Sequence, residues 1–278
     1  MIYIHTSKIA SLLGYNRYTT QEKYVELFLE YLYKNREELS KQDQIQILDS
    51  TEKYNNIVNK VINDSSDINK EKLKEILFDN VVSTNDLITK TKNINELIDN
   101  LDYNKLEKGK IKKEIQHNIN CNYGINTELP GISRFEELTF LKVYNNNAKL
   151  FVLDMNYYKI CGKADGFCKK DDKEYIFEMK NRKFKLFETI PIYETIQLVM
   201  YTKLCNMNNI IFVQNMDDNM KIDYLDNYNN EELYNEIMTK LNKYIKLIIH
   251  FQTNNEQRKL FLQKSKRQKY KYILDNIN

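Results

Sequence analysis

The stretch GKADGFCKKDDKEYIFEMKNRK, residues 162–183, decides the fold class and the candidate chemistry of this chain. It joins two apolar, β-prone runs, residues 160–167 and 174–179, through a charged loop at 169–173. Two such runs with a short polar loop between them predict a β-hairpin. Charged residues in this apolar setting are rarely buried unless they are paired or bind a metal.

Three charged side chains are expected to meet in this hairpin. Side chains alternate along a strand, so Glu178 and Lys180 point one way and Phe177 and Met179 point the other. Asp165 ends the preceding strand, and the hairpin brings its carboxylate toward Glu178. Two adjacent carboxylates raise each other's pKa unless a cation lies between them, and Mg²⁺ suits that place. The alternative is a salt-bridged hairpin on the surface.

The sequence around the hairpin predicts an α/β fold, a sheet flanked by helices. An extended segment at 1–5 precedes a short helix, which Thr6 or Ser7 caps and Gly14 ends, and a longer helix begins near Thr20. Beyond these, we expect strands at 138–144, 148–153 and 210–214, a turn at 145–147, and helices at 70–78, 94–101, 110–118, 128–138, 193–204, 231–252 and 258–271.

Composition divides the chain into three expected parts. Residues 1–108 form a helical N-terminal region, in which neither Gly nor Pro occurs between Tyr15 and Lys108. Residues 109–225 form the core, where Pro130 is expected in the first turn of a helix. Residues 226–278 form C-terminal helices that pack on the core.

Charge and cysteine content exclude several classes of function. The 278 residues carry a net charge of +3, so any basic surface must be local. The four cysteines form no CxxC pair, which disfavours a zinc or iron–sulfur site and indicates a reduced, intracellular protein. No apolar run approaches the length of a membrane span and no signal peptide is evident, so we expect a soluble protein of the cytoplasm or a viral replication site.

The spacing Asp165-x₁₂-Glu178-x-Lys180 on adjacent strands resembles the signature of the PD-(D/E)XK nuclease superfamily. Residues 123–143, YGINTELPGISRFEELTFLKV, resemble the glutamate-bearing helix of phage lambda exonuclease and YqaJ-type viral recombinases. Gln197 and Tyr201 match the Q-x-x-x-Y helix of that family, and HTSKIASLLGYN near the start is similar to its TAS segment. The resemblance covers residues 6–18 and 124–213.

This resemblance implies a restriction-endonuclease-like mixed central sheet and a set of site residues. Glu128, Asp165, Glu178 and the backbone carbonyl of Met179 would hold Mg²⁺, with Mn²⁺ as a substitute. The alternative for Glu128 is a charge that complements the helix dipole in a first turn. The catalytic set implied is Asp165, Glu178, Lys180, Glu128 and Gln197, with Tyr201 packing and orienting beside it.

Basic residues near the site are expected to contact DNA. Arg182, Lys183 and Lys185 follow the catalytic strand and can track phosphates; the alternative is a solvated face. The resemblance places Ser7 on a DNA phosphate, although a plain N-cap is the alternative, and the two roles are compatible. The arginine that lambda-type enzymes place before this serine is missing here, and Arg17 or Lys23 could substitute. The basic residues of 258–271 could contact DNA or a partner, or form an ordinary exposed helix face.

The expected function is therefore a Mg²⁺-dependent deoxyribonuclease that degrades one strand of a duplex end from 5′ to 3′. The resemblance implies double-stranded DNA ends as substrate, a single-strand annealing protein as a possible partner, a role in viral recombination or repair, and a possible ring-shaped trimer. The alternatives are an endonuclease of the same fold, structure-specific or acting on single strands, and an inactive nucleic-acid-binding protein.

Overall fold

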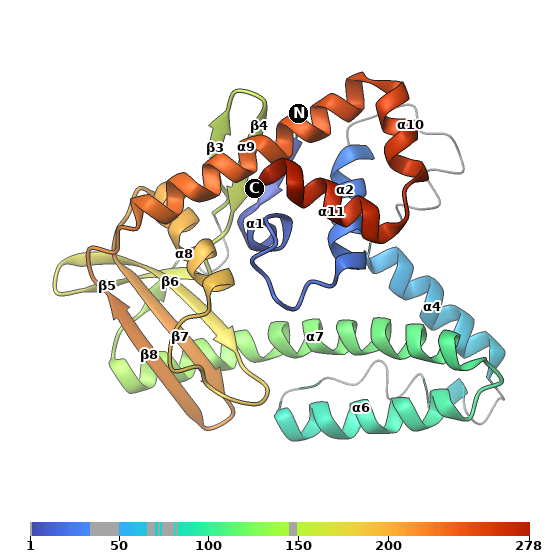
Figure 1. Ribbon diagram of the computed structural model, residues 1–278. Helices are drawn as coiled ribbons and strands as arrows, with labels where there is room; N and C mark the ends of the chain where they lie inside the picture. The colour runs from blue at the N-terminus through green and yellow to red at the C-terminus, as the bar shows by residue number, and fades with distance from the viewer. Residues whose placement is uncertain are drawn as a thin grey trace.

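A computed structural model describes residues 2–33, 50–65, 70–71, 73, 81, 83–144 and 149–278, which form an α/β arrangement (Figure 1). The strands are β1 Ile2–His5, β2 Val143–Tyr144, β3 Phe151–Met155, β4 Tyr158–Gly162, β5 Gly166–Lys170, β6 Lys173–Asn181, β7 Ile210–Met216 and β8 Asn219–Leu225. The helices are α1 Thr6–Leu12, α2 Gln21–Tyr33, α4 Ser50–Asp64, α6 Thr84–Asp99, α7 Lys105–Thr139, α8 Ile192–Cys205, α9 Glu231–Thr253, α10 Asn255–Gln263 and α11 Lys266–Ile277.

The larger sheet is mixed, in the order β2-β5-β6-β7-β8. The predicted hairpin is confirmed: β5 and β6 pair antiparallel, and Lys170 lies opposite Lys173 across a two-residue turn. Asp171 and Asp172 in that turn have φ of 49° and 60°, the left-handed conformation that Asp tolerates in tight hairpins. Strands β6 and β7 run parallel, and α8 connects them.

The predicted continuous strand at 160–167 is wrong, because the chain changes sheets within it. Strand β4 ends at Gly162 and belongs to a separate three-stranded sheet, in the order β1-β4-β3. Strand β5 begins at Gly166 in the larger sheet. The short break between the two strands contains Asp165, which places this residue beside β6 but outside the ladder.

Two helices cover opposite faces of the larger sheet. Ile132 and Phe135 of α7 pack with Phe177 and Met179 of β6. Leu198 and Tyr201 of α8 pack with residues of the other face, including Ile176, Ala164 and Phe212. The predicted alternation along β6 is therefore confirmed, and Glu178 and Lys180 share the α8 side.

A single helix, α7, replaces the two that were expected at 110–118 and 128–138. Pro130 lies inside this helix rather than in a first turn, and Gly109 also lies within it. The prediction took Gly and Pro as helix boundaries, but buried contacts on one face along the helix override these local preferences. Helix α7 also crosses the boundary expected at residue 108, so no element ends there.

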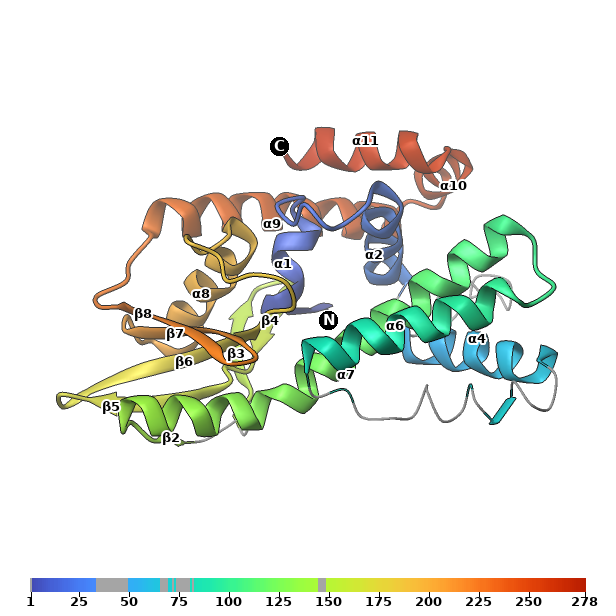
Figure 2. The same ribbon diagram turned by 90° about the horizontal axis from the view of Figure 1, so that it is seen from below.

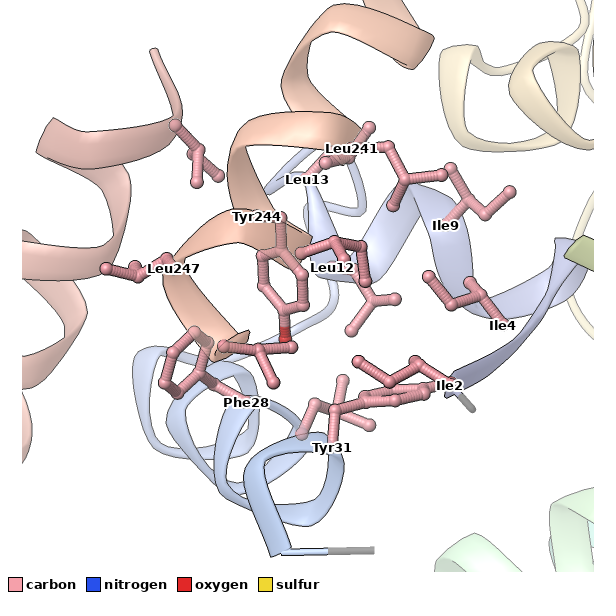
Figure 3. Packing of buried hydrophobic residues seen from close by; sticks show 14 of the residues in the cluster. Ile2, Ile4, Ile9, Leu12, Leu13, Phe28, Tyr31, Leu241, Tyr244 and Leu247 are labelled. Carbon is pink, nitrogen blue, oxygen red and sulfur yellow. The ribbon is translucent and has the colours of Figure 1, made fainter. Parts of the chain in front are cut away.

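The helices around the sheet form two groups. Helices α4 and α6 pack on the N-terminal half of α7 through a cluster that includes Val61, Ile98 and Ile115 (Figure 2). The N-terminal elements β1, α1 and α2 instead pack on α9, with Ile4, Phe28 and Tyr244 among the buried residues (Figure 3). The N-terminal segment thus packs with the C-terminal helices.

Several smaller expectations have separate outcomes. Helices α8 and α9 confirm those expected at 193–204 and 231–252. The basic helix expected at 258–271 is two helices, α10 and α11, because Ser265 forms a capping box with Gln268 and starts a new one. Strand β8 was not among the predicted strands. The expected turn at 145–147 and most of the helix at 70–78 lie outside the described residues. Of the helices described, none is long and apolar enough to cross a membrane.

Candidate functional site

Asp165 immediately precedes β5, at the point where β6 continues beyond its last β5 partner. The last pair between the two strands is Gly166 with Phe177, so the next residues of β6 have no β5 partner on that edge. The Asp165 carboxylate takes the vacant place, and its Oδ2 accepts a 2.8 Å hydrogen bond from the Met179 N–H. The interruption between β4 and β5 therefore fixes the Asp165 carboxylate against β6, the strand that carries Glu178 and Lys180.

Glu178 and Lys180 form an ion pair at this place. The side chain of Glu178 is only 1% exposed, whereas that of Lys180 is 25% exposed, so the pair has a buried end and a solvent end. The Lys180 Nζ donates to Oε1 of Glu178. Burial and, after it, the Asp165 carboxylate raise the pKa of Glu178 to about 8 against the opposing effect of Lys180.

The pKa shifts of the other two groups follow from the same arrangement. Burial raises the pKa of Asp165, while Lys180 and the Met179 N–H act in the opposite direction. Burial lowers the pKa of the Lys180 ammonium, but the Glu178 and Asp165 carboxylates outweigh it and raise that pKa above its ordinary value. Lys180 is therefore held as a cation beside two crowded carboxylates.

Helix α8 supplies two polar residues next to these charges. The Gln197 amide donates to the Tyr201 hydroxyl at 2.9 Å, and that hydroxyl donates to the Lys163 carbonyl at 2.6 Å. Burial raises the pKa of Tyr201, and the Glu178 carboxylate adds to the shift. Tyr201 is buried and its hydroxyl links Gln197 to the Lys163 carbonyl, and its orienting role in the site stays a prediction.

Asp165 and Glu178 fit a magnesium ion by the chemistry of their donors. Oxygen Oε2 of Glu178 is buried and has no hydrogen-bond partner among the residues that the structure describes. Asp165 uses one oxygen on the Met179 N–H, which leaves its second oxygen for a ligand role. Mg²⁺ takes one or two carboxylates together with carbonyl, water and phosphate oxygens. These two carboxylates would hold the ion, and the Met179 carbonyl stays a predicted third ligand.

Glu128 does not join these carboxylates, contrary to expectation. Over the described ranges, no three His, Cys, Asp or Glu side chains are close enough to hold a metal ion together. The reason is the position of α7, which covers the Phe177 and Met179 face while Glu178 points to the other face. Glu128 is half-buried and engaged in an interaction of its own.

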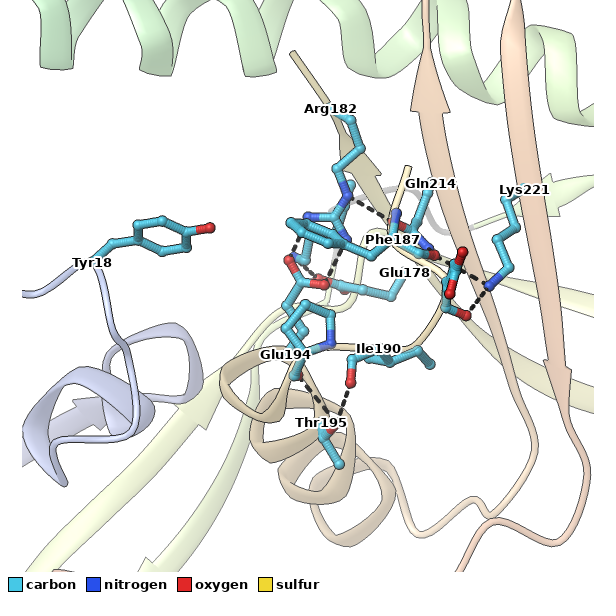
Figure 4. A network of polar contacts seen from close by, with 12 residues as sticks. Tyr18, Glu178, Arg182, Phe187, Ile190, Glu194, Thr195, Gln214 and Lys221 are labelled. Carbon is cyan, nitrogen blue, oxygen red and sulfur yellow. Dashed lines mark hydrogen bonds and ion pairs between the residues drawn. The ribbon is translucent and has the colours of Figure 1, made fainter. Parts of the chain in front are cut away.

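The prediction that Arg182 tracks DNA phosphates is wrong. Its side chain is 9% exposed, and its guanidinium makes two hydrogen bonds of 2.6 Å to the Glu194 carboxylate of α8 (Figure 4). The Nε also donates to the Gln214 side chain at 3.0 Å. A guanidinium with three internal hydrogen bonds in a buried site is not available to a phosphate.

This buried network holds the segment between β6 and α8. Gln214 is fully buried, and its amide accepts from the Phe187 N–H at 2.9 Å and donates to the Phe187 carbonyl at 3.0 Å. The Arg182 guanidinium lies 4.6 Å from the centre of the Phe187 ring. Lys221 of β8 donates to the Phe187 and Glu188 carbonyls. Three elements, α8, β7 and β8, thus fix the chain that leaves the candidate site.

A group of basic side chains gathers around His117 of α7. Burial lowers the pKa of His117, and the ammonium groups of Lys23, Lys8 and Lys183 lower it further, while Glu114 raises it. These lysines come from α2, α1 and the segment after β6. Sequence reasoning assigned no function to His117 or Lys8, and named Lys23 only as a substitute for the missing arginine. These residues are far apart in the sequence, so the sequence alone does not indicate that they form a cluster.

The other residues predicted to bind DNA lie at the surface. Arg17 is exposed and lies 4.9 Å from the Tyr18 ring centre, and Tyr18 packs edge-on against Tyr193 of α8 at 5.8 Å. Lys185 is also exposed. Ser7 is exposed but is not the N-cap of α1, because His5 occupies that position. The His5 side chain makes no capping hydrogen bond.

Comparisons with known proteins add little to this description. No family model matches the chain, and no curated protein matches it. Among solved structures, the chain is similar to SSO0001 at 16% identity, over 69% of this chain and 85% of that protein, with a TM-score of 0.34.

Gly162 lies beside the site at a contact that leaves no room for a side chain. A Cβ there would lie 2.6 Å from Oγ1 of Thr6 and 2.9 Å from Cε1 of Tyr201. We expect Gly162→Ala to lower the free energy of unfolding by about 1–3 kcal/mol, the usual cost of overpacking. Urea denaturation of both proteins measures this difference.

The matched control for Gly162 is Gly109→Ala, because Gly109 lies in α7 with nothing within 4 Å of the added Cβ. Replacing a helical glycine by alanine should raise the free energy of unfolding, by about 0.8–1.0 kcal/mol at most. A stability loss in the control as large as that of Gly162→Ala would contradict the packing argument.

The raised pKa of Glu178 predicts how stability depends on pH in the metal-free protein. Between its ordinary pKa near 4.5 and its folded value of about 8, the folded protein keeps a proton that the unfolded chain has lost. The contribution of Glu178 to stability is full below that window and is lost as pH rises through it. In EDTA, Glu178→Gln should therefore lose less stability than the unchanged protein between pH 5 and pH 8.

Glu136→Gln is the control for this titration. A hydrogen bond from Lys142 holds the pKa of Glu136 below its ordinary value, so the contribution of Glu136 is present at neutral pH and is lost only in acid. This variant should keep the pH 5 to 8 dependence of the unchanged protein. If Glu178→Gln keeps it as well, Glu178 does not hold the proton.

Proposed function

We propose that this chain is a Mg²⁺-dependent deoxyribonuclease with a restriction-endonuclease-like core, acting as a 5′ to 3′ exonuclease on duplex DNA ends. The observation that carries the proposal is the meeting of Asp165, Glu178 and Lys180 at the break between β4 and β5. Helix α8, with Gln197 and Tyr201 beside these charges, supports it. The mixed sheet with parallel β6 and β7 is compatible with that core.

The side chains of the site have separable roles in this proposal. Asp165 and Glu178 hold the metal ion, which supplies electrostatic stabilisation of the phosphate. Lys180 presents a permanent cation at the solvent end of the pair and stabilises charge that develops on the phosphate in the transition state. Gln197 orients substrate or water, and Tyr201 fixes the backbone at Lys163.

Arg182 is buried and cannot support a nucleic-acid substrate. The basic cluster around His117 provides that support instead. Lys8, Lys23 and Lys183 come from three separate elements and each lowers the pKa of one histidine, so positive charge is concentrated near His117 on a chain of small net charge. Phosphate contacts of this kind give affinity without sequence preference. Exposed Arg17 and Lys185 remain candidates to extend this surface.

Digestion of end-labelled DNA tests the proposed function. The substrates are linear duplexes with 5′-phosphate, 5′-hydroxyl or recessed ends, together with closed and nicked circles, each with Mg²⁺ or EDTA. We expect Mg²⁺-dependent release of mononucleotides from linear duplex and no digestion of closed circles. Cleavage of closed circles or of single strands would favour an endonuclease of the same fold. Binding of duplex without any cleavage would favour the inactive nucleic-acid-binding alternative.

A further inference from the structure

A cavity of about 620 Å³ lies between α6 and α7 and is bordered by the segment that follows β6. Ile88, Thr91 and Asn95 of α6 line one side. Gln116 and Asn120 of α7 line another, and Lys183 and Phe184 border the rest. Its volume falls within the 300–1,000 Å³ that is typical of small-molecule sites. The resemblance noted above does not extend to α6.

Lys183 offers this cavity a cation without an internal partner. In the part of the chain that the structure describes, it makes no ion pair with any carboxylate, and burial lowers its pKa to about 8. Each of the two carboxylates that line the cavity has a lysine partner of its own, and one of these lysines, Lys92, also lines the cavity. Asp99 pairs with Lys112 at 2.6 Å, and Glu96 lies 4.0 Å from Lys92. An anion from outside the chain is therefore the natural partner for Lys183.

Phe184 offers a flat apolar surface next to that cation. Its side chain is 80% exposed, and Ile88 across the cavity is 54% exposed. Gln116 donates to Asn120 within the wall, and the remaining amide groups there can accept or donate to a ligand. An exposed aromatic ring beside a lysine is the arrangement on which nucleobases stack while the backbone phosphate is neutralised.

The cavity is held at a fixed position relative to the candidate site. Arg182, the residue before Lys183, donates its N–H to the Asn215 carbonyl at 2.7 Å and accepts at its own carbonyl from the Tyr123 hydroxyl at 3.2 Å. Lys183 follows Lys180 by three residues and also acts on His117, so it belongs to both the basic cluster and the cavity. A strand that passes along the basic cluster thus reaches the cavity.

We propose that this cavity binds one unpaired nucleotide of a DNA strand, with its base against Phe184 and its phosphate at Lys183. This inference rests on the proposed function, since it assigns a site to the single strand next to the point of cleavage. It also gives α6 a task in binding substrate.

The test uses the full chain in EDTA, so that binding is measured without cleavage. The probe is a single-stranded oligodeoxynucleotide that carries 2-aminopurine, whose fluorescence falls when it stacks on an aromatic ring. We expect Phe184→Ala to weaken binding by roughly 5- to 150-fold, the loss that follows from removing one base–aromatic stack, and to relieve the quenching. Lys183→Ala should weaken binding and reduce its dependence on salt.

Matched controls separate this effect from a general loss of aromatic or basic side chains. Phe140 is 90% exposed at the far end of α7, and Lys142 lies near it, 80% exposed. Phe140→Ala and Lys142→Ala should leave both affinity and quenching unchanged. Free deoxynucleoside monophosphate is tested as a competitor. We expect it to compete poorly with the oligonucleotide, because it lacks the phosphates of the rest of the strand.

The outcomes distinguish this inference from the proposed function. If Phe184→Ala binds and quenches like Phe140→Ala, or if the unchanged chain binds no single strand, the inference is overturned. A chain that stacks 2-aminopurine through Phe184 but never cleaves DNA supports this site and refutes the nuclease proposal. A chain that cleaves duplex ends but binds single strands equally well without Phe184 supports the nuclease proposal and refutes this site.

Discussion

Lys180→Ala should reduce the rate of Mg²⁺-dependent DNA cleavage by about 10²–10³-fold, the usual effect of removing one preorganised electrostatic group. The ammonium lies at the solvent end of a buried carboxylate pair, where a reacting phosphate would meet it. Its interaction is stronger with the charge of the transition state than with the ground state, so kcat should fall while DNA affinity largely survives. Single-turnover cleavage and equilibrium binding of the same duplex measure the two effects.

The control for Lys180 is Lys173→Ala, which removes an exposed lysine at the other end of β6. That variant should cleave at the rate of the unchanged protein. Because Lys180 also pairs with Glu178, circular dichroism must first establish that Lys180→Ala is folded. A folded Lys180→Ala variant with near-normal turnover would remove Lys180 from the mechanism.

The sequence predicted the centre of this site because strand alternation is a strong local constraint. Two-residue spacing placed Glu178 and Lys180 on one face, and the charged turn of the hairpin brought Asp165 beside them. These inferences needed only short-range geometry. The change of sheet at Gly162 was not predicted, because it depends on the pairing of β4 with β1, more than 150 residues away along the chain.

The sequence reasoning failed where a residue's surroundings come from distant elements. Arg182 was placed with its charged neighbours, yet the alternation that pairs Glu178 with Lys180 also puts Arg182 on the α8 face. Glu128 failed for a different reason: the prediction began a helix at residue 128 with Pro130 in its first turn, whereas packing carries α7 through Pro130 and places this helix on the sheet face opposite to Glu178.

Arg182→Ala should lower the free energy of unfolding by about 3–5 kcal/mol, because it leaves the Glu194 carboxylate buried without its partner. Both side chains are under 10% exposed and share two hydrogen bonds of 2.6 Å. The loss also removes one of the hydrogen bonds that Gln214 accepts. Glu194→Ala should produce a loss of similar size, and chemical denaturation measures both.

The double variant Arg182→Met/Glu194→Leu separates a missing partner from a missing ion pair. If the cost of each single change comes from an uncompensated buried charge, removing both charges should recover most of the lost stability, since apolar side chains of similar volume replace buried pairs at little cost. Lys169→Ala is the control for a surface pair, as its partner Asp172 is 98% exposed, and it should change stability by no more than about 1 kcal/mol. The contrary result is a double variant whose loss of stability equals the sum of the losses in the two single variants. It would mean that the network stabilises the fold through Gln214 and Phe187 rather than through the charges. The segment after β6 would then be held by its amide contacts alone.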